Sequence, residues 1–299
     1  MDKVIVNSQL SATSRLFSTA VINDLARKGT SSLFARLAKE SLPLLSNICY
    51  KSPISDLFES AYLLLRRKNY RHEYVYKAAI THKILLGKHS LNTATMVNEF
   101  RVGKNKADAV IFNGTTTVYE IKSERDSLSR LANQIASYKK VFKRINVISG
   151  YNHADTIRKS IPKNVGIIVL SDRFQMTTLR EAEDCIDELE PKAIFNSLRL
   201  REAEKILLKY GFKIPELPNT KMHPALGEMF STLSPIEAHD GMVDIIRKTR
   251  SSIALNELLK FLPHSLQPVI LNSRIRKKDH SRFLEAINTP ISEALTWNQ

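Results

Sequence analysis

The sequence predicts an α/β fold, in which a mixed sheet is flanked by helices and helical segments precede and follow this core along the chain. Three observations support this prediction. Apolar residues recur at spacings of three and four near both ends of the chain, short β-branched runs fill its middle, and an apolar helical stripe separates these runs from two further buried strands. We therefore expect a helical N-terminal segment over residues 1–70, an α/β core over residues 71–171 and a helical C-terminal region over residues 172–299.

The N-terminal segment is expected to consist of short helices. Gly29 interrupts the apolar periodicity, and Ser31 or Ser32 is placed to cap the helix that follows. A further helix over residues 72–86 is expected to end at Gly87 in the left-handed conformation, because glycine adopts a positive φ without steric cost.

The central segment changes from helical to strand periodicity. Gly103 and the pair Asn113-Gly114 are typical turn residues between strands. After Ser171 no strand is expected, and helical patterning, including a helix over residues 195–210, continues to the C-terminus. The elements predicted for the core are strands over residues 95–102, 107–112, 115–122, 145–149 and 165–170, with a helix over residues 127–143 and a short helix through Ile157 and Ile161.

Net charge, cysteine content and the lengths of apolar runs limit the partners and the environment expected for this protein. The chain of 299 residues has 45 Lys and Arg against 30 Asp and Glu, a net charge of +15, and this excess favours polyanionic partners, nucleic acid before a membrane surface. Cys49 and Cys185 are the two cysteines, so the fold does not depend on disulfides, no zinc site is expected, and a reducing cytoplasm fits. The sequence contains no apolar run near 18 residues and no signal-peptide pattern over residues 1–10, so we expect no membrane association.

Two carboxylates and a lysine lie at the ends of neighbouring predicted strands. Glu120 and Lys122 are two residues apart and therefore share one face of a strand, while Ile121 faces the other. With Asp108 they supply two oxygen ligands for a divalent cation and an ammonium group beside the position of a bound water. Magnesium takes one or two protein carboxylates and completes its coordination with water and substrate phosphate.

The turn between these strands decides whether the carboxylates can meet. A two-residue Asn113-Gly114 hairpin would place Asp108 and Glu120 on opposite faces of the sheet. A three-residue loop with Gly114 in the left-handed conformation would place them on the same face. The sequence is compatible with both loops.

With Gln134 and Tyr138 on the following helix, these residues resemble the PD-(D/E)XK nuclease superfamily over residues 71–171. The Gln-x-x-x-Tyr element is similar to that of the RecB-like branch, and the match is typical of a bacterial or phage subgroup. One departure is that Ala107, and not proline, precedes Asp108.

The resemblance implies a restriction-endonuclease-like fold and a nuclease that uses Mg or Mn. It implies that Asp108 and Glu120 bind the metal, that Lys122 orients or activates the attacking water, and that a glutamate from the preceding helix completes the site. Glu73 is the best match for that glutamate, and Glu99 on the first strand is its rival.

Each of these residues also has a simpler interpretation. Glu120 and Lys122 alone could form a surface ion pair, Tyr138 fits the apolar stripe of its helix, Glu73 fits an exposed helix position, and Glu99 could pair with Arg101. The histidines, including His82, His89 and His153, are interpreted as structural or surface residues. The candidate nucleic-acid contacts, each with a solvated surface position as its alternative, are Arg125, Arg130, Arg274, Arg276, Lys277 and Lys278, with Arg66, Arg67 and Lys68 as a further basic run.

We expect a metal-dependent nuclease that hydrolyses phosphodiester bonds, with DNA as the favoured substrate. Two alternatives stay open. The first is a nucleic-acid-binding protein that retains the nuclease fold without turnover. The second is a scaffold that recruits a protein partner through the C-terminal helices.

Overall fold

The computed structural model of the chain describes residues 3–45, 48–273 and 275–297 and contains two compact units. The first, which we call the helical unit, joins Met1–His82 to Ile253–Gln299, and the second, the sheet unit, is Lys83–Ser252. This division differs from the predicted boundaries after residues 70 and 171. Within the described residues, no helix is both long enough and apolar enough to span a bilayer.

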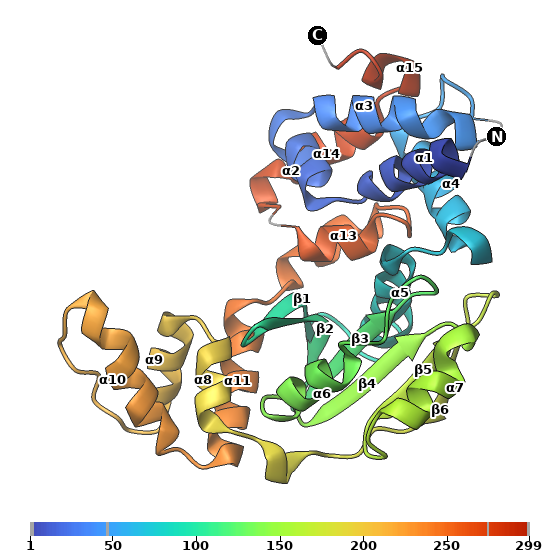
Figure 1. The fold of residues 1–299 in the computed structure, drawn as a ribbon. Helices are drawn as coiled ribbons and strands as arrows, with labels where there is room; N and C mark the ends of the chain where they lie inside the picture. Colours follow the sequence, from blue (N-terminus) through green and yellow to red (C-terminus); the bar gives the residue numbers. More distant parts are fainter. Residues whose placement is uncertain (1–2, 46–47, 274, 298–299) are drawn as a thin grey trace. The chain divides into compact units, whose positions relative to one another are not determined.

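The helical unit combines helices from both ends of the chain (Figure 1). Pro53 and Pro290 form an antiparallel bridge, and the Ile54 N–H donates to the Thr289 carbonyl oxygen at 3.0 Å. Phe17 stacks on Tyr74 with ring centroids 4.3 Å apart. The helices of this unit are α1 (Lys3–Arg15), α2 (Thr19–Lys28), α3 (Ser32–Ser41), α4 (Ile54–Arg66), α5 (Glu73–Ile80), α12 (Asn256–Lys260), α13 (Gln267–Asn272), α14 (His280–Ile287) and α15 (Ile291–Ala294).

The predicted stop signals in the helical unit are partly correct. Gly29 ends α2 with a φ of 80°, and the Ser31 side chain caps α3 by accepting the Phe34 N–H. The predicted helix over residues 72–86 is shorter than expected, because α5 ends at Ile80 and a π-helical turn covers Thr81–Leu85. Gly87 does not adopt a positive φ, so the predicted left-handed stop there is wrong.

The sheet unit contains a six-stranded mixed sheet in the order β1-β2-β3-β4-β5-β6 among the described residues (Figure 1). The pairs β1–β2, β2–β3 and β5–β6 are antiparallel, and β3–β4 and β4–β5 are parallel. The strands are β1 (Thr95–Val102), β2 (Asn105–Phe112), β3 (Thr116–Lys122), β4 (Arg144–Ser149), β5 (Gly166–Leu170) and β6 (Met176–Arg180). The predicted α/β class and mixed sheet are therefore confirmed.

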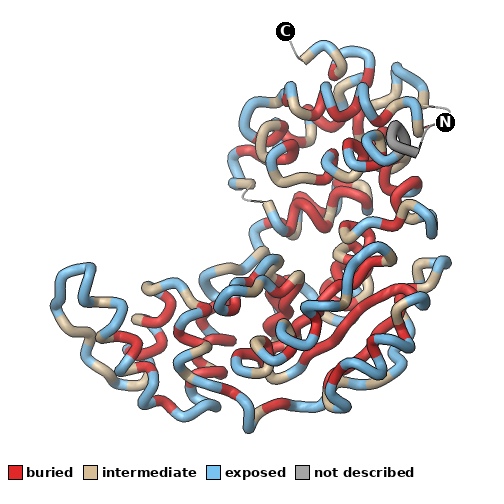
Figure 2. Tube along the Cα trace, viewed as in Figure 1, coloured by how far each residue is buried: buried red, intermediate tan, exposed pale blue. Residues whose placement is uncertain are grey.

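Strand β6 contradicts the expectation that no strand follows Ser171. It pairs antiparallel with β5 at the edge of the sheet, and none of its residues is buried. A half-buried strand would alternate apolar and polar residues, whereas an edge strand exposed on both faces has no such pattern. The two apolar strands of the predicted core, β4 and β5, are buried over most of their length (Figure 2).

One face of the sheet packs against helices in a continuous apolar core. Val110, Val118 and Val147 contribute from the strands, and Ile135 and Tyr138 contribute from α6. The helices of the sheet unit are α6 (Leu131–Lys139), α7 (Tyr151–Ser160), α8 (Pro191–Ser197), α9 (Leu200–Lys209), α10 (Asn219–Ser231) and α11 (Pro235–Thr249). The helix predicted over residues 195–210 is thus two helices, and the core includes residues from α8 to α11 that were expected to form a separate region.

A buried histidine links α11 to the sheet. His239 is fully buried, its Nε2 lies 3.0 Å from Thr116 Oγ1, and its Nδ1 lies 2.7 Å from Asp240 Oδ1. Thr116 Oγ1 also accepts the Lys143 N–H at 2.9 Å. Burial lowers the pKa of His239 below its usual value, against the opposing effect of Asp240. The neutral ring is therefore the form that the folded state prefers.

We expect acid to destabilise the sheet unit through His239. Its folded pKa is depressed, so the unfolded chain binds more protons below the unfolded pKa of about 6.5, and stability falls as pH decreases through that value. The melting temperature measured between about pH 8 and pH 5 should fall more steeply for the native chain than for His239→Gln. His223→Gln, at an exposed position, should follow the native curve. Identical slopes for all three proteins would contradict this role.

Candidate active site

The loop between β2 and β3 has three residues. Ala109 is paired with Tyr119 and Phe112 with Thr116, which leaves Asn113, Gly114 and Thr115 in the turn. Gly114 has a φ of 85°, a conformation that favours glycine. Of the two predicted hairpins the structure has the three-residue one, and its register makes Asp108 and Glu120 the next opposing positions along the two strands.

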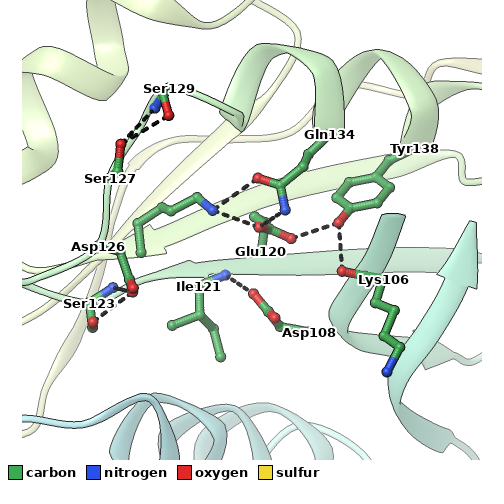
Figure 3. Close-up of polar contacts among 11 residues, drawn as sticks. Lys106, Asp108, Glu120, Ile121, Ser123, Asp126, Ser127, Ser129, Gln134 and Tyr138 are labelled. Atoms are coloured by element: carbon green, nitrogen blue, oxygen red, sulfur yellow. Dashed lines mark hydrogen bonds and ion pairs between the residues drawn. The ribbon is translucent and has the colours of Figure 1, made fainter. Parts of the chain in front are cut away.

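Glu120 lies at the centre of a buried polar network (Figure 3). Its Oε1 accepts from Lys122 Nζ at 2.8 Å and from Gln134 Nε2 at 2.6 Å, and Lys122 Nζ also donates to Gln134 Oε1 at 2.9 Å. Glu120 is 1% exposed and Lys122 is 8% exposed. The pair is therefore a buried ion pair in which the Lys122 ammonium and both Glu120 oxygens have hydrogen-bond partners, and the simpler interpretation as a surface salt bridge is wrong.

Tyr138 completes this network from the same helix as Gln134. Its hydroxyl lies 2.8 Å from Glu120 Oε2 and 2.9 Å from the carbonyl oxygen of Lys106, so its one proton can go to either acceptor. Burial raises the pKa of Tyr138 far above its ordinary value, and the nearby Glu120 carboxylate raises it further. Tyr138 is thus both a core residue, packed 6.2 Å from the Phe142 ring, and a neutral hydrogen-bond donor to the site.

The Asp108 carboxylate also contacts β3, through a backbone N–H of that strand. Its Oδ2 accepts the backbone N–H of Ile121 at 2.7 Å. Figure 3 shows the Asp108 carboxylate beside Ile121 at β3, whereas the Glu120 carboxylate turns toward Gln134 and Tyr138. The β2–β3 pairing ends at Ala109 and Tyr119, and beyond it the Asp108 side chain accepts the Ile121 N–H in place of a backbone carbonyl oxygen. The spacing between Asp108 and Glu120 did not indicate this role.

The segment after Lys122 is a loop and not the start of the predicted helix over residues 127–143. Asp126 Oδ2 accepts from the Ser123 N–H at 2.8 Å and from the Ser123 hydroxyl at 2.6 Å, and Ser127 donates to Ser129. Serine and aspartate side chains that bond the local backbone compete with helix formation. The Ser-x-x-Asp spacing is the sequence signal that could have revealed this turn.

The loop carries the two arginines predicted to contact nucleic acid near the site. Arg125 is exposed within the turn, and Arg130 is exposed at the N-cap of α6. Both arginines therefore belong to the short loop that joins the strand of Lys122 to the helix of Gln134.

The two glutamates considered as third ligands have other partners. Glu73 belongs to the helical unit, where its Oε1 lies 2.6 Å from Lys77 Nζ. Glu99 is more than half exposed and lies 3.4 Å from Lys106 Nζ, so the predicted pairing with Arg101 is replaced by a contact across the β1–β2 hairpin. Glu99 also has a φ of 52°, an unusual value for a non-glycine residue.

The C-terminal basic run lies in the helical unit. Arg276 is paired with Asp279, with Nε and Oδ2 2.8 Å apart, and Lys277 and Lys278 are exposed. Arg274 lies outside the described residues. Arg276, Lys277 and Lys278 therefore do not belong to the same unit as Glu120.

The donor set at the site fits magnesium better than a softer metal. Among the described residues no group of three or more His, Cys, Asp or Glu side chains could hold a metal ion. Magnesium takes one or two protein carboxylates, since water and substrate phosphate complete its coordination. Glu120 is one such carboxylate, whereas the Asp108 carboxylate is directed to the Ile121 N–H and not toward Gln134 and Tyr138. Three donors occupy Glu120, and a carboxylate offers about four acceptor positions, so one position stays available for a cation.

The sequence of this chain is similar to that of a bacteriophage protein. Residues 66–267 match the family model described as Bacteriophage P4 protein cII. The curated protein named Protein cII, from Enterobacteria phage P4, is 26% identical over 209 residues, which cover 66% of this chain and 76% of that protein. No solved structure matches the chain. The family match includes the whole six-stranded sheet and all residues of the Glu120 network, and it ends before the C-terminal basic run.

Proposed function

This chain belongs to the bacteriophage P4 protein cII family, and we propose that it is a divalent-metal-dependent nuclease that hydrolyses phosphodiester bonds, with DNA as the favoured substrate. The observation that carries the proposal is the buried Glu120–Lys122 ion pair held by Gln134 and Tyr138. Moving two charges out of water costs several kcal/mol per ion, so burial of the pair is by itself weak evidence for a stabilising role. We assign the pair a chemical role because Gln134 and Tyr138, from a different element, fix it in one orientation. Its residues are those of the PD-(D/E)XK resemblance.

Asp108 and Glu120 are the residues that would hold the metal. A bound magnesium ion would polarise the phosphate and lower the pKa of a bound water. Gln134 and Tyr138 fix the Glu120 carboxylate from α6, so its orientation is set before any ligand arrives. The restriction-endonuclease-like core is part of this proposal, supported by the helix that follows β3 and by the parallel pairing of β3 with β4.

Lys122 would act directly on the reacting groups. An ammonium group has three donors, and in the described structure two of them go to Glu120 Oε1 and Gln134 Oε1. The third can donate to a phosphate oxygen or to a water next to it. Because Glu120 and Gln134 fix the Nζ position, Lys122 can stabilise negative charge that develops on the phosphate without a costly rearrangement.

A second candidate function is nucleic-acid binding without cleavage. It is favoured by the near-complete burial of Glu120, whose two oxygens already accept from three donors. In that case the network would be a structural polar cluster that stabilises the contact of α6 with the sheet.

A cleavage assay distinguishes the two candidates. The purified chain is incubated with labelled single-stranded, double-stranded and branched DNA and with RNA, in Mg²⁺, in Mn²⁺ and in a chelator. We expect cleavage that requires the metal and that is lost in Glu120→Gln, which removes the charge but keeps the shape. Glu190→Gln, at an exposed residue of the same unit paired with Lys140, is the matched control and should cleave normally. Binding without cleavage of any substrate would favour the second candidate.

A further inference from the structure

Two segments far apart in the sequence form one basic surface in the helical unit. The C-terminal end of α2 meets the start of α14, and Arg282 Nη1 donates to the Arg27 carbonyl oxygen at 2.8 Å. The Arg282 side chain also lies beside Gly29, where a Cβ would meet Arg282 Cγ at 3.5 Å. We call the cationic side chains of these two segments the basic array, and its members are Arg27, Lys28, Arg276, Lys277, Lys278 and Arg282.

A buried carboxylate holds the C-terminal half of the basic array in place. Asp279 is 2% exposed, and its Oδ2 lies 2.8 Å from Arg276 Nε while its Oδ1 lies 3.7 Å from Arg282 Nη1. Between these arginines, Lys277 and Lys278 belong to a single 3-10 turn that ends at Asp279. Asp279 therefore orients two guanidinium groups while the lysines project from the same turn.

The basic array has an excess of positive charge that its acidic neighbours do not balance. Lys28 pairs with Asp24 at 2.9 Å, and Arg276 and Arg282 contact Asp279. With Glu285, which lies one turn after Arg282 on α14, three carboxylates oppose six cationic side chains and leave three positive charges in excess. Arg27, Lys277 and Lys278 are exposed and take part in no ion pair within the described part of the chain. Arg276 and Arg282 remain 60% and 49% exposed despite their contacts with Asp279, so their outer N–H groups can reach a ligand.

We infer that the basic array binds the phosphate backbone of nucleic acid. Guanidinium groups held in a fixed orientation match phosphate oxygens in two parallel hydrogen bonds, and lysines beside them add charge without reading sequence. A membrane surface fits less well, because binding there also needs apolar side chains that insert between lipids. The large apolar side chains exposed in the described part of the helical unit are Tyr50, Leu63, Ile253 and Phe261, and all lie outside α2 and α14.

This inference goes beyond the proposed nuclease activity and does not depend on it, since no residue of the basic array belongs to the sheet unit. Binding is therefore measured in a chelator, where a metal-dependent nuclease cannot cleave. The probes are a fluorescent duplex of about 20 base pairs and its single strand, and the readout is anisotropy at several salt concentrations.

The test variant is the triple substitution Arg27→Gln, Lys277→Gln, Lys278→Gln. Its matched control is Arg36→Gln, Lys39→Gln, Lys51→Gln, which removes the same charge from exposed positions of the same unit outside the array. We expect the test variant to bind at least about tenfold more weakly, with a salt slope reduced by up to about 0.9 for each lost phosphate contact, while the control stays near the native values. Equal losses in both triples, native affinity in the test variant, or stronger binding to phosphatidylserine vesicles than to DNA would overturn the inference.

Discussion

Replacing Lys122 with glutamine is expected to lower phosphodiester cleavage by about 10²–10³-fold, the loss typical when one positioned donor to the charge developing in the transition state is removed. Glutamine removes the charge of Lys122 and keeps an N–H donor within the network of Glu120 and Gln134. The buried carboxylate of Glu120 thus keeps partners, including the Tyr138 hydroxyl, and the variant is expected to fold. Single-turnover cleavage with saturating Mg²⁺ measures the effect directly.

Lys140→Gln is the control for this substitution. Lys140 is about half exposed at the end of α6 and pairs with Glu190, so its loss should change cleavage little. Circular dichroism and melting temperature of both variants establish that they are folded, and DNA affinity should be close to native in each. A folded Lys122→Gln protein that cleaves at the native rate would exclude Lys122 from the reaction.

The largest effect on stability is expected at Glu202 in α9. Its carboxylate accepts from Arg250 Nη2 at 2.6 Å and Nε at 2.9 Å, and the Arg250 guanidinium also lies 5.1 Å from the centre of the Phe100 ring. Burial acts to raise the pKa of Glu202, but the hydrogen bonds from Arg250 and from the Arg199 backbone outweigh it and hold this pKa below its ordinary value. The pair therefore connects α9, the end of α11 and β1 in its ionised form.

Glu202→Ala should destabilise the sheet unit by about 3 kcal/mol, because it leaves Arg250 largely buried without its counter-charge. A change of this size lowers the melting temperature of a unit of this length by about 6–12 °C, which calorimetry resolves. Glu204→Ala on the same helix makes no such pair among the described residues and should change the melting temperature by little. Similar shifts for the two variants would show that helix propensity, and not the ion pair, determines the effect.

The sequence alone predicted a structural feature correctly wherever that feature depends on a few neighbouring residues. Strand β1 has the predicted bounds, Gly29 and Ser31 end and begin their helices as expected, and Glu120 and Lys122 share one side of β3. These features depend on φ preferences, capping hydrogen bonds and the two-residue period of a strand, all of which the local sequence carries.

The sequence predicted which residues form the candidate site, but it did not predict all of their contacts. Spacing and resemblance identified Glu120, Lys122, Gln134 and Tyr138, and the structure brings these four together. The hairpin register was one of two possibilities, because Asn113-Gly114 suits both loops and packing of the strands selects between them. The bond from the Ile121 N–H to Asp108 depends on where the β2–β3 pairing ends, and spacing along the chain does not determine that point.

Contacts between distant segments were decided only by the tertiary structure. Strand β6 is stabilised by its pairing with β5 and has no burial pattern of its own, so its sequence carries no period to detect. The bridge between Pro53 and Pro290 and the bond between Arg282 and Arg27 join residues more than 200 positions apart. Periodicity indicates that a helix has an apolar face but not which partner covers it, so the assignment of the C-terminal helices to two different units depends on the packing of the folded chain.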